Sequence, residues 1–305
     1  MTILNQATNQ LDKDKAKLWL AAIKPPMYTV AIIPISFGTA LAYQATRVFD
    51  GRIFLTFLGS AIAIIAWLNL TNDVFDADTG IDVNKAHSVV NLTGNKNLVF
   101  WIANFFLFLG LGGIFLINWW QKDTTVFCLI LASCFLGYTY QGPPFRFGYL
   151  GLGEIICFFT FGPMAIASAY YSQTQAFSGH SLLVSIIIGL STSIILFCSH
   201  FHQIKDDLAA GKKSPIVRFG TSNGAKIVII STLMVYVLSS IFVIGQQLPQ
   251  ATLLIWLSFP IAYQLINHVH QYHGQPEKMK NSKFIAVNFH FCSGLLLCLG
   301  LWLQF

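Results

Sequence analysis

Nine apolar runs in this sequence are each long enough to cross a lipid bilayer as a helix. A hydrocarbon layer about 30 Å thick needs about 20 helical residues. The runs lie near residues 27–46, 53–72, 97–118, 124–141, 150–171, 181–200, 225–246, 250–268 and 284–304. We therefore predict an all-α, polytopic membrane protein, a bundle of about nine transmembrane helices.

The composition agrees with folding in lipid. Of the 305 residues, 55% are hydrophobic and 10% are charged, whereas about 25% charged residues is usual for soluble domains. The six cysteines are scattered through the apolar runs without a CxxC pair: Cys128, Cys134, Cys157, Cys198, Cys292 and Cys298. This spacing predicts neither a zinc site nor a disulfide framework, so we interpret them as packing residues.

The N-terminal segment differs from the rest of the chain. Residues 1–17 are polar, and no signal-peptide cleavage site precedes the first apolar run. We therefore expect a polar segment, 1–17, followed by a single intramembrane domain, 18–305. Three prolines fall inside predicted spans, where they are expected to kink the helices: Pro34, Pro163 and Pro260.

Lysine and arginine are distributed unequally between the two sides of the predicted bundle. Fifteen lie in the N-terminal segment or in connections on its side: Lys13, Lys15, Lys17, Lys24, Lys85, Lys96, Arg146, Lys205, Lys212, Lys213, Arg218, Lys226, Lys278, Lys280 and Lys283. Only Arg47, Arg52 and Lys122 fall on the other side. The positive-inside rule predicts a cytoplasmic N-terminus and a C-terminus on the opposite side of the membrane.

A polar stripe ends the second apolar run. Asn69, Asn72, Asp73 and Asp76 follow one another at i, i+3, i+4 and i+7, which places them on one face of a helix. Carboxylates at the edge of a hydrophobic span cost free energy unless they have a positive partner. The stripe is therefore a candidate cation site.

A second polar cluster follows the sixth run, on the same predicted side of the membrane. It contains His202, Gln203, Asp206 and Asp207, and Gly211 and Lys212 come next. On a continuing helix Gln203 lies three residues before Asp206 and four before Asp207, so the oxygen ligands converge. Oxygen donors of this kind suit Mg²⁺ completed by substrate phosphates. Lys212 supplies a cation within reach of a phosphate.

Other interpretations of the acidic residues exist. A single aspartate at a helix end is more often a solvated residue or a cap, and Lys212 and Lys213 alone are typical of topology determinants or lipid contacts. An ion-coupled transporter also carries intramembrane carboxylates, but it predicts inverted repeats with breaks near the bilayer midplane. Two acidic clusters at one mouth of the bundle favour a catalytic site.

The two clusters resemble the aspartate-rich motifs of a known family. Asn72-Asp73-Val-Phe-Asp76 with Asp82 resembles the first motif of the UbiA superfamily of intramembrane prenyltransferases, and His202-Gln203-Ile-Lys-Asp206-Asp207 with Gly211-Lys212 resembles the second. The resemblance implies two Mg²⁺ ions that clamp an isoprenyl diphosphate inside a helical bundle. The expected fold then has a central cavity open to the cytoplasmic side.

Two longer phrases narrow the resemblance. The stretch from Asn72 through Asp82 to Asn91, and the stretch Gly137-Tyr-Thr-Tyr-Gln-Gly-Pro-Pro-Phe-Arg-Phe-Gly-Tyr-Leu-Gly-Leu-Gly-Glu154, are most similar to 1,4-dihydroxy-2-naphthoate prenyltransferases. Within these they are most similar to the cyanobacterial phytyl-transferring branch. The resemblance implies transfer of a phytyl or other isoprenyl group to 1,4-dihydroxy-2-naphthoate with decarboxylation, in phylloquinone or menaquinone biosynthesis. Homogentisate and 4-hydroxybenzoate are the alternative acceptors.

The chain departs from the family pattern at three positions. Gly80 replaces the third aspartate of the first motif, with Asp82 as our chosen substitute and Asp78 as the other candidate. Gln203 replaces the first aspartate of the second motif, which removes one negative charge. Arg146 follows Tyr140 by six positions, where many members have a lysine at the fourth.

The resemblance and the chemistry together assign a role to each candidate residue. Predicted metal ligands are Asn72, Asp73, Asp76, Asp82, Gln203, Asp206 and Asp207. Predicted substrate-binding residues are Asn69, Lys24, Lys85, Arg146, His202, Lys205 and Lys212. The four aspartates Asp73, Asp76, Asp206 and Asp207 are also predicted to be catalytic, with Tyr138 and Tyr140 stabilising a carbocation. Most of the remaining histidines are interpreted as interfacial or packing residues. Membrane lipid surrounds the protein, in the plasma or thylakoid membrane, and no nucleic acid partner is expected.

Overall fold

A computed structural model describes residues 17–81 and 88–303, and these fold into helices without a strand. Residues 17–23 are helical. The remaining elements are η1 (Pro25–Tyr28), α2 (Thr29–Thr46), α3 (Gly51–Thr79), α4 (Val89–Thr93), α5 (Lys96–Gln121), α6 (Thr125–Gln141), η2 (Phe147–Leu150), α7 (Gly153–Phe159), η3 (Thr160–Met164), α8 (Ala165–Thr174), α9 (Gly179–Ala209), α10 (Pro215–Ile244), η4 (Gln250–Ser258), α11 (Phe259–Tyr272), α12 (Pro276–Met279) and α13 (Ser282–Trp302). The predicted all-α class is confirmed.

The predicted membrane spans correspond to helices. Within the described ranges, eight helical stretches are long and apolar enough to cross a membrane. The remaining predicted run forms α6, an apolar helix of 17 residues. Seventeen residues rise about 26 Å along a helix axis, slightly less than the thickness of a hydrocarbon layer.

The two helices that carry the acidic clusters extend past their apolar runs. The second run ends near residue 72, but α3 continues to Thr79, and α9 continues to Ala209 although its run ends near 200. Asp50 begins α3 by accepting a hydrogen bond from the Ile53 N–H. Gly80 ends it in the left-handed conformation, with φ 73°. Both clusters are therefore held on helices.

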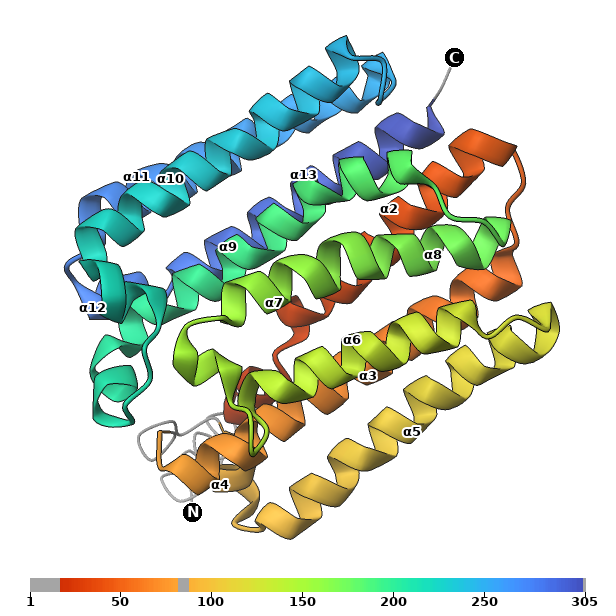
Figure 1. Ribbon diagram of the computed structural model, residues 1–305. Helices are drawn as coiled ribbons and strands as arrows, with labels where there is room; N and C mark the ends of the chain where they lie inside the picture. The colour runs from red at the N-terminus through yellow and green to blue at the C-terminus, as the bar shows by residue number, and fades with distance from the viewer. Residues whose placement is uncertain (1–16, 82–87, 304–305) are drawn as a thin grey trace, which may run out of the picture.

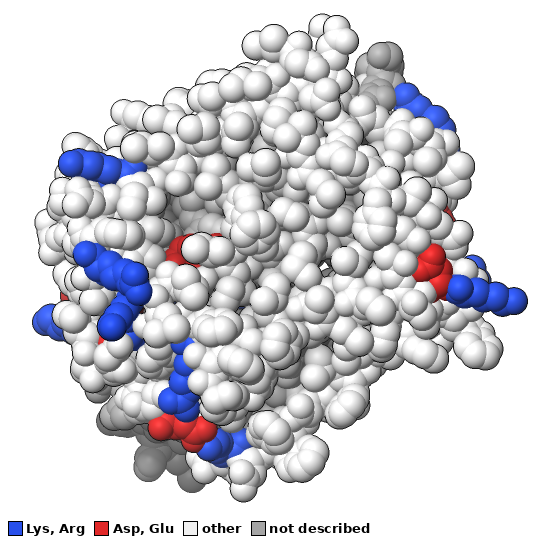
Figure 2. All heavy atoms as spheres, in the orientation of Figure 1, with Lys and Arg blue, Asp and Glu red and all other residues white. Residues whose placement is uncertain are grey.

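The long helices lie side by side and expose their connections at two ends of the bundle (Figure 1). At one end, Trp302 near the end of α13 stacks on Tyr43 of α2, with ring centroids 4.2 Å apart. At the other end, Lys24 reaches Asp73 of α3. On the face shown in Figure 2, charged side chains lie mostly toward the edges, and the middle is largely uncharged. This distribution is typical of a protein surrounded by lipid.

Among the candidate membrane spans, α9 and α5 differ most in the buried share of their apolar windows. In the apolar window of α9, 67% of the residues are buried, compared with 22% for α5. Helix α9 contacts α10, α13 and α7, whereas α5 exposes Trp101, Phe108 and Trp119. The second acidic cluster thus follows the apolar window that is most enclosed among the candidate membrane spans of the described residues.

Close approach of α5 to α3 depends on a glycine. A Cβ placed on Gly110 of α5 would lie 2.9 Å from the Ser60 carbonyl oxygen of α3. Small residues at such positions allow helix backbones to pack closely in membranes.

The three prolines predicted to kink spans have different surroundings. Pro163 lies in the π-helical turn η3, between α7 and α8. Pro260 lies in the first turn of α11, directly after the 3₁₀ helix η4. Pro34 lies inside α2, which continues through it.

Candidate active site

A cavity of about 1490 Å³ lies between the two acidic clusters. It is larger than the roughly 300–1,000 Å³ of typical ligand sites. Its polar lining comes from both clusters and from neighbouring segments, and includes Asn69, Asn72, Asp73, Asp76, His202, Gln203, Lys205, Asp206, Asp207, Lys24, Tyr140, Gln141 and Lys212. Clusters separated by more than 120 residues of sequence therefore face one space.

The donors that hold Asp73 on the α3 wall of the cavity include a lysine and a backbone N–H. The Lys24 Nζ donates to its Oδ1 over 3.1 Å, and the Val89 backbone N–H donates to its Oδ2 over 2.9 Å. The Asp73 side chain is only 1% exposed. Lys24 was predicted to bind substrate, and the structure places its ammonium on a predicted metal ligand.

Asp76 lies one turn further along α3. The amide Nε2 of Gln141, the last residue of α6, donates to Asp76 Oδ1 over 2.6 Å. Gln141 is a site residue that sequence reasoning missed, because 65 residues separate it from Asp76. It lies, however, directly after Tyr140 in one of the phrases that carry the family resemblance.

Asp78 points away from this cavity. It pairs with Lys96, and both side chains are substantially exposed, at 37% and 44%. Asp78 is not among the residues that line the cavity. Asp82 and Lys85, the other two candidates of the first motif, lie outside the described residues.

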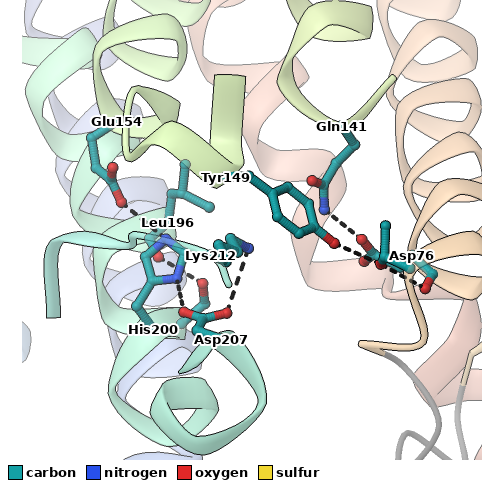
Figure 3. A network of polar contacts seen from close by, with 10 residues as sticks. Asp76, Gln141, Tyr149, Glu154, Leu196, His200, Asp207 and Lys212 are labelled. Carbon is teal, nitrogen blue, oxygen red and sulfur yellow. Dashed lines mark hydrogen bonds and ion pairs between the residues drawn. The ribbon is translucent and has the colours of Figure 1, made fainter. Parts of the chain in front are cut away.

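On the α9 wall, Asp207 belongs to a buried network of charged side chains (Figure 3). Its Oδ2 lies 3.2 Å from His200 Nδ1, and its Oδ1 lies 3.7 Å from Lys212 Nζ. The other ring nitrogen of His200 lies 3.1 Å from Glu154 Oε1 on α7. His200 was among the histidines that were mostly interpreted as interfacial or packing residues, and the structure places it between two carboxylates. Its position seven residues before Asp207, two helical turns on one face, was the available signal.

The two predicted carbocation-stabilising tyrosines occupy different places. Tyr140 lines the cavity, with Lys212 Nζ 5.9 Å from its ring centroid. Tyr138 lies outside the lining, packs edge-on against Phe75, and donates its hydroxyl to the Pro143 carbonyl. Residues two apart on a helix point in very different directions, so the two side chains cannot share one face.

Arg146 also lies outside the cavity lining. It directly precedes η2, with φ 47°, and its buried Nε has no hydrogen-bond partner. Within η2, the Tyr149 hydroxyl makes a 2.6 Å hydrogen bond with the Thr79 hydroxyl of α3. Burial raises the pKa of the Tyr149 phenol.

The donor set of the two walls fits Mg²⁺. Carboxylate and amide oxygens face the cavity from both sides, and Asp207 Oδ1 is buried without a hydrogen-bond partner. Among the described residues, no group of three His, Cys, Asp or Glu side chains could hold a metal unaided. Mg²⁺ is commonly bound by one or two carboxylates together with waters and substrate phosphates. The walls are therefore suited to a metal that arrives with a phosphate ligand.

Below the polar rim, the cavity continues between apolar side chains. These include Val30 and Ile35 of α2, Phe57 and Ile65 of α3, Ile130 of α6 and Phe161 of η3. Phe57 and Asp73 are sixteen residues apart on one helix, a rise of about 24 Å. The cavity thus offers an apolar site for a long hydrocarbon chain beneath a polar site for its charged head.

Comparison with known proteins gives consistent results. Residues 31–294 match the UbiA prenyltransferase family. The chain is 63% identical over 284 residues to a 2-carboxy-1,4-naphthoquinone phytyltransferase of Synechocystis sp.. This alignment covers 93% of this chain and 92% of the relative. The chain is 40% identical over 295 residues to the chloroplastic 2-carboxy-1,4-naphthoquinone phytyltransferase of Arabidopsis thaliana, covering 94% and 77% respectively.

Solved structures share the fold at low sequence identity. A UbiA homolog from Archaeoglobus fulgidus bound to GPP and Mg²⁺ has a TM-score of 0.58 and 15% identity, covering 92% of this chain and 99% of that chain. A digeranylgeranylglyceryl phosphate synthase has a TM-score of 0.60 and 15% identity, covering 94% and 99%.

Proposed function

The chain belongs to the UbiA prenyltransferase family, and we propose that it transfers a phytyl group from phytyl diphosphate to 1,4-dihydroxy-2-naphthoate. The acceptor loses its carboxylate as carbon dioxide, which serves phylloquinone or menaquinone biosynthesis. The observation that carries this proposal is that the α3 and α9 clusters line one cavity with an apolar extension. The two similar phytyltransferases supply the choice of donor and ring system.

The diphosphate of the donor binds between the two walls. Asn72, Asp73 and Asp76 would hold Mg²⁺ from α3, and Gln203, Asp206 and Asp207 from α9. Bound Mg²⁺ would supply positive charge to the diphosphate, which becomes a better leaving group. Lys212 lies at the same rim and stabilises the negative charge that develops as the diphosphate departs.

The isoprenoid tail lies in the apolar part of the cavity. Enclosure by α2, α3 and α6 excludes water, which would otherwise intercept the reactive allylic carbon. The Tyr140 ring lines the cavity beside the polar rim, where its face can stabilise positive charge on that carbon. Tyr138 has no such access and is proposed instead to support the packing of α6.

The acceptor must be electron rich, because its ring carbon attacks a carbocation. In 1,4-dihydroxy-2-naphthoate, a ring electron pair forms the new C–C bond, and the C–COO⁻ bond then breaks to restore the aromatic ring. Carbon dioxide leaves and no external oxidant is required. The 2-carboxy-1,4-naphthoquinone in the relatives' names has two electrons fewer, so it requires prior reduction. We place the acceptor carboxylate near His202 or Lys24, since Arg146 does not line the cavity.

We propose that the cavity opens toward the cytoplasm, with the N-terminus on that side and the C-terminus on the other. Support comes from the fifteen lysines and arginines counted on that side, against three on the opposite side. The membrane is the plasma or thylakoid membrane.

A product assay by mass tests the function. Purified protein receives Mg²⁺, phytyl, geranylgeranyl or longer diphosphates, and each aromatic acceptor in turn. We expect phytylated naphthohydroquinone, or its quinone after air oxidation, with one carbon dioxide released per product. Preference for homogentisate or 4-hydroxybenzoate would overturn the acceptor assignment. A transporter, the other class considered, would show no Mg²⁺-dependent binding of an isoprenyl diphosphate.

A further inference from the structure

The segment between α6 and α7 connects the two walls of the cavity. Its residue Tyr149, in η2, lies between Asp76 and Gln141 on one side and Asp207 and Lys212 on the other (Figure 3). On the α3 side, its hydroxyl bonds to the Thr79 hydroxyl over 2.6 Å. The Thr79 hydroxyl also donates to the Asp76 carbonyl. The phenol is therefore attached to the turn of α3 that carries Asp76.

The backbone of the same residue contacts the second wall. The Tyr149 carbonyl accepts a hydrogen bond from the Lys213 N–H over 2.8 Å, and the neighbouring Leu150 carbonyl accepts one from Arg218 over 2.5 Å. Lys212 Nζ lies 5.8 Å from the centroid of the Tyr149 ring. The Lys212 N–H in turn bonds to the Asp207 carbonyl over 2.8 Å.

Tyr149 thus contacts both the α3 turn that carries the first motif and the loop that follows the second motif. The side chain of Tyr149 fixes its distance to α3, and its carbonyl fixes its distance to the loop that carries Lys212. A diphosphate that is clamped between two walls binds only if their separation matches its length, since loss of about an ångström of positioning is costly. A residue that sets this separation acts without touching the substrate.

We infer that Tyr149 is a positioning residue that holds the α3 and α9 walls at the separation required to bind one diphosphate. This inference rests on the proposed function. The phenol hydroxyl and the Thr79 hydroxyl form the link to the first wall, and neither is assigned to a metal or to the reacting atoms.

The test uses variants that remove single hydroxyl groups. Tyr149→Phe keeps the ring and its contact with Lys212, and Thr79→Val keeps the shape of the other partner. Tyr171→Phe is the matched control, because the Tyr171 hydroxyl bonds Asp123 at 2.8 Å and neither residue lines the cavity. Thermal unfolding of each variant checks that the fold is retained.

Binding is measured with geranylgeranyl thiodiphosphate, an unreactive donor analogue, at several Mg²⁺ concentrations. Loss of one hydrogen bond should raise the dissociation constant about three- to tenfold in Tyr149→Phe and in Thr79→Val. The double variant should bind no more weakly than Thr79→Val alone, because both changes remove the Tyr149–Thr79 bond and Thr79→Val already removes the bond to the Asp76 carbonyl as well. Tyr171→Phe should bind as the unmodified protein does. In turnover, KM for the naphthoate should stay constant while KM for phytyl diphosphate rises.

Results other than these would contradict either the positioning role of Tyr149 or the proposed function itself. Unchanged binding in Tyr149→Phe, additive losses in the double variant, or an equal loss in Tyr171→Phe would overturn the positioning role. If the unmodified protein shows no Mg²⁺-dependent binding of the analogue, both the proposed function and this inference are wrong. Binding by the unmodified protein with no effect of Tyr149→Phe removes the inference alone.

Discussion

The α3 and α9 walls of the cavity hold their carboxylates in different ways. On α3, Asp76 accepts a hydrogen bond from the neutral amide of Gln141, and Asp73 accepts one from the Val89 N–H as well as one from Lys24. On α9, Asp207 lies between His200 and Lys212, so its partners are groups that can carry positive charge. Each wall thus contains a carboxylate paired with a lysine, Asp73 with Lys24 and Asp207 with Lys212. The walls differ in the second partner of that carboxylate, which is a neutral backbone N–H for Asp73 and the His200 ring for Asp207.

This difference suggests a division of labour between the walls. The Gln141 amide orients Asp76 without itself adding positive charge beside it. On both walls a lysine lies beside a carboxylate, Lys24 beside Asp73 and Lys212 beside Asp207, and only on α9 is a histidine added to the pair. Gln203 fits this pattern, because it adds an oxygen donor to the α9 wall without adding charge. Loss of the Asp76 charge on α3 should accordingly cost more than loss of the uncharged Gln203 oxygen on α9.

The largest expected effect comes from Asp76→Asn. The asparagine oxygen can still accept the hydrogen bond from Gln141, so the change removes charge while it preserves shape. We expect turnover to fall at least about a hundredfold, the scale on which a group that stabilises developing charge contributes. The measurement is product formation by mass across Mg²⁺ concentrations, with thermal unfolding as the control for folding. Near-normal turnover would remove the assignment of the α3 wall as a metal site.

The sequence predicted the spans and the facing clusters because both depend on local pattern. Apolar length reports a membrane helix, and polar spacing reports a helix face. Hydropathy could not locate the ends of α3 and α9, since the polar turns that follow the apolar runs remain helical.

The partners of the site residues depend on tertiary contacts, which local pattern does not encode. Asp76 and Gln141 are 65 residues apart, and Thr79 and Tyr149 are 70 apart. The different places of Tyr138 and Tyr140 could have been anticipated from helical periodicity alone. The position of Lys24 beside Asp73 could not, because residues before the first long helix have no register with α3.

A smaller effect is expected at Gln203, the uncharged oxygen donor on the α9 wall. If Gln203 contributes an oxygen ligand, Gln203→Asp should remain active and bind Mg²⁺ more tightly, whereas Gln203→Leu should lose about tenfold in activity because no oxygen remains. Both variants are assayed for turnover as a function of Mg²⁺ concentration. Equal activity of the aspartate and leucine variants would argue against coordination by this residue.

His200 should affect folding stability more than chemistry. It lies between Glu154 and Asp207 and is 2% exposed. His200→Phe leaves two carboxylates without this partner, so we expect a loss of about 1–3 kcal/mol in the free energy of unfolding. His200→Gln, which retains a hydrogen-bond donor, should lose less and keep turnover within about fivefold. Denaturation in detergent and the product assay measure the two effects. If His200→Gln were as inactive as Asp76→Asn, the view that ion pairs on α9 are mainly structural would be wrong.

The smallest effect is expected at Asp78, only two residues from Asp76. Two residues turn a helix by about 200°, so the two carboxylates point to nearly opposite faces. Asp78 pairs with Lys96 at an exposed position, and exposed ion pairs contribute about 0–1 kcal/mol. Asp78→Asn should therefore leave turnover within about twofold of the unmodified protein and should not change its Mg²⁺ dependence. Asp82→Asn, assayed in parallel, should lower turnover and raise the Mg²⁺ concentration that is required if Asp82 replaces the aspartate that is absent at Gly80. A loss in Asp78→Asn comparable with that in Asp76→Asn would mean that the outer face of α3 also takes part, and the contrast between one functional face and one solvated face would no longer hold.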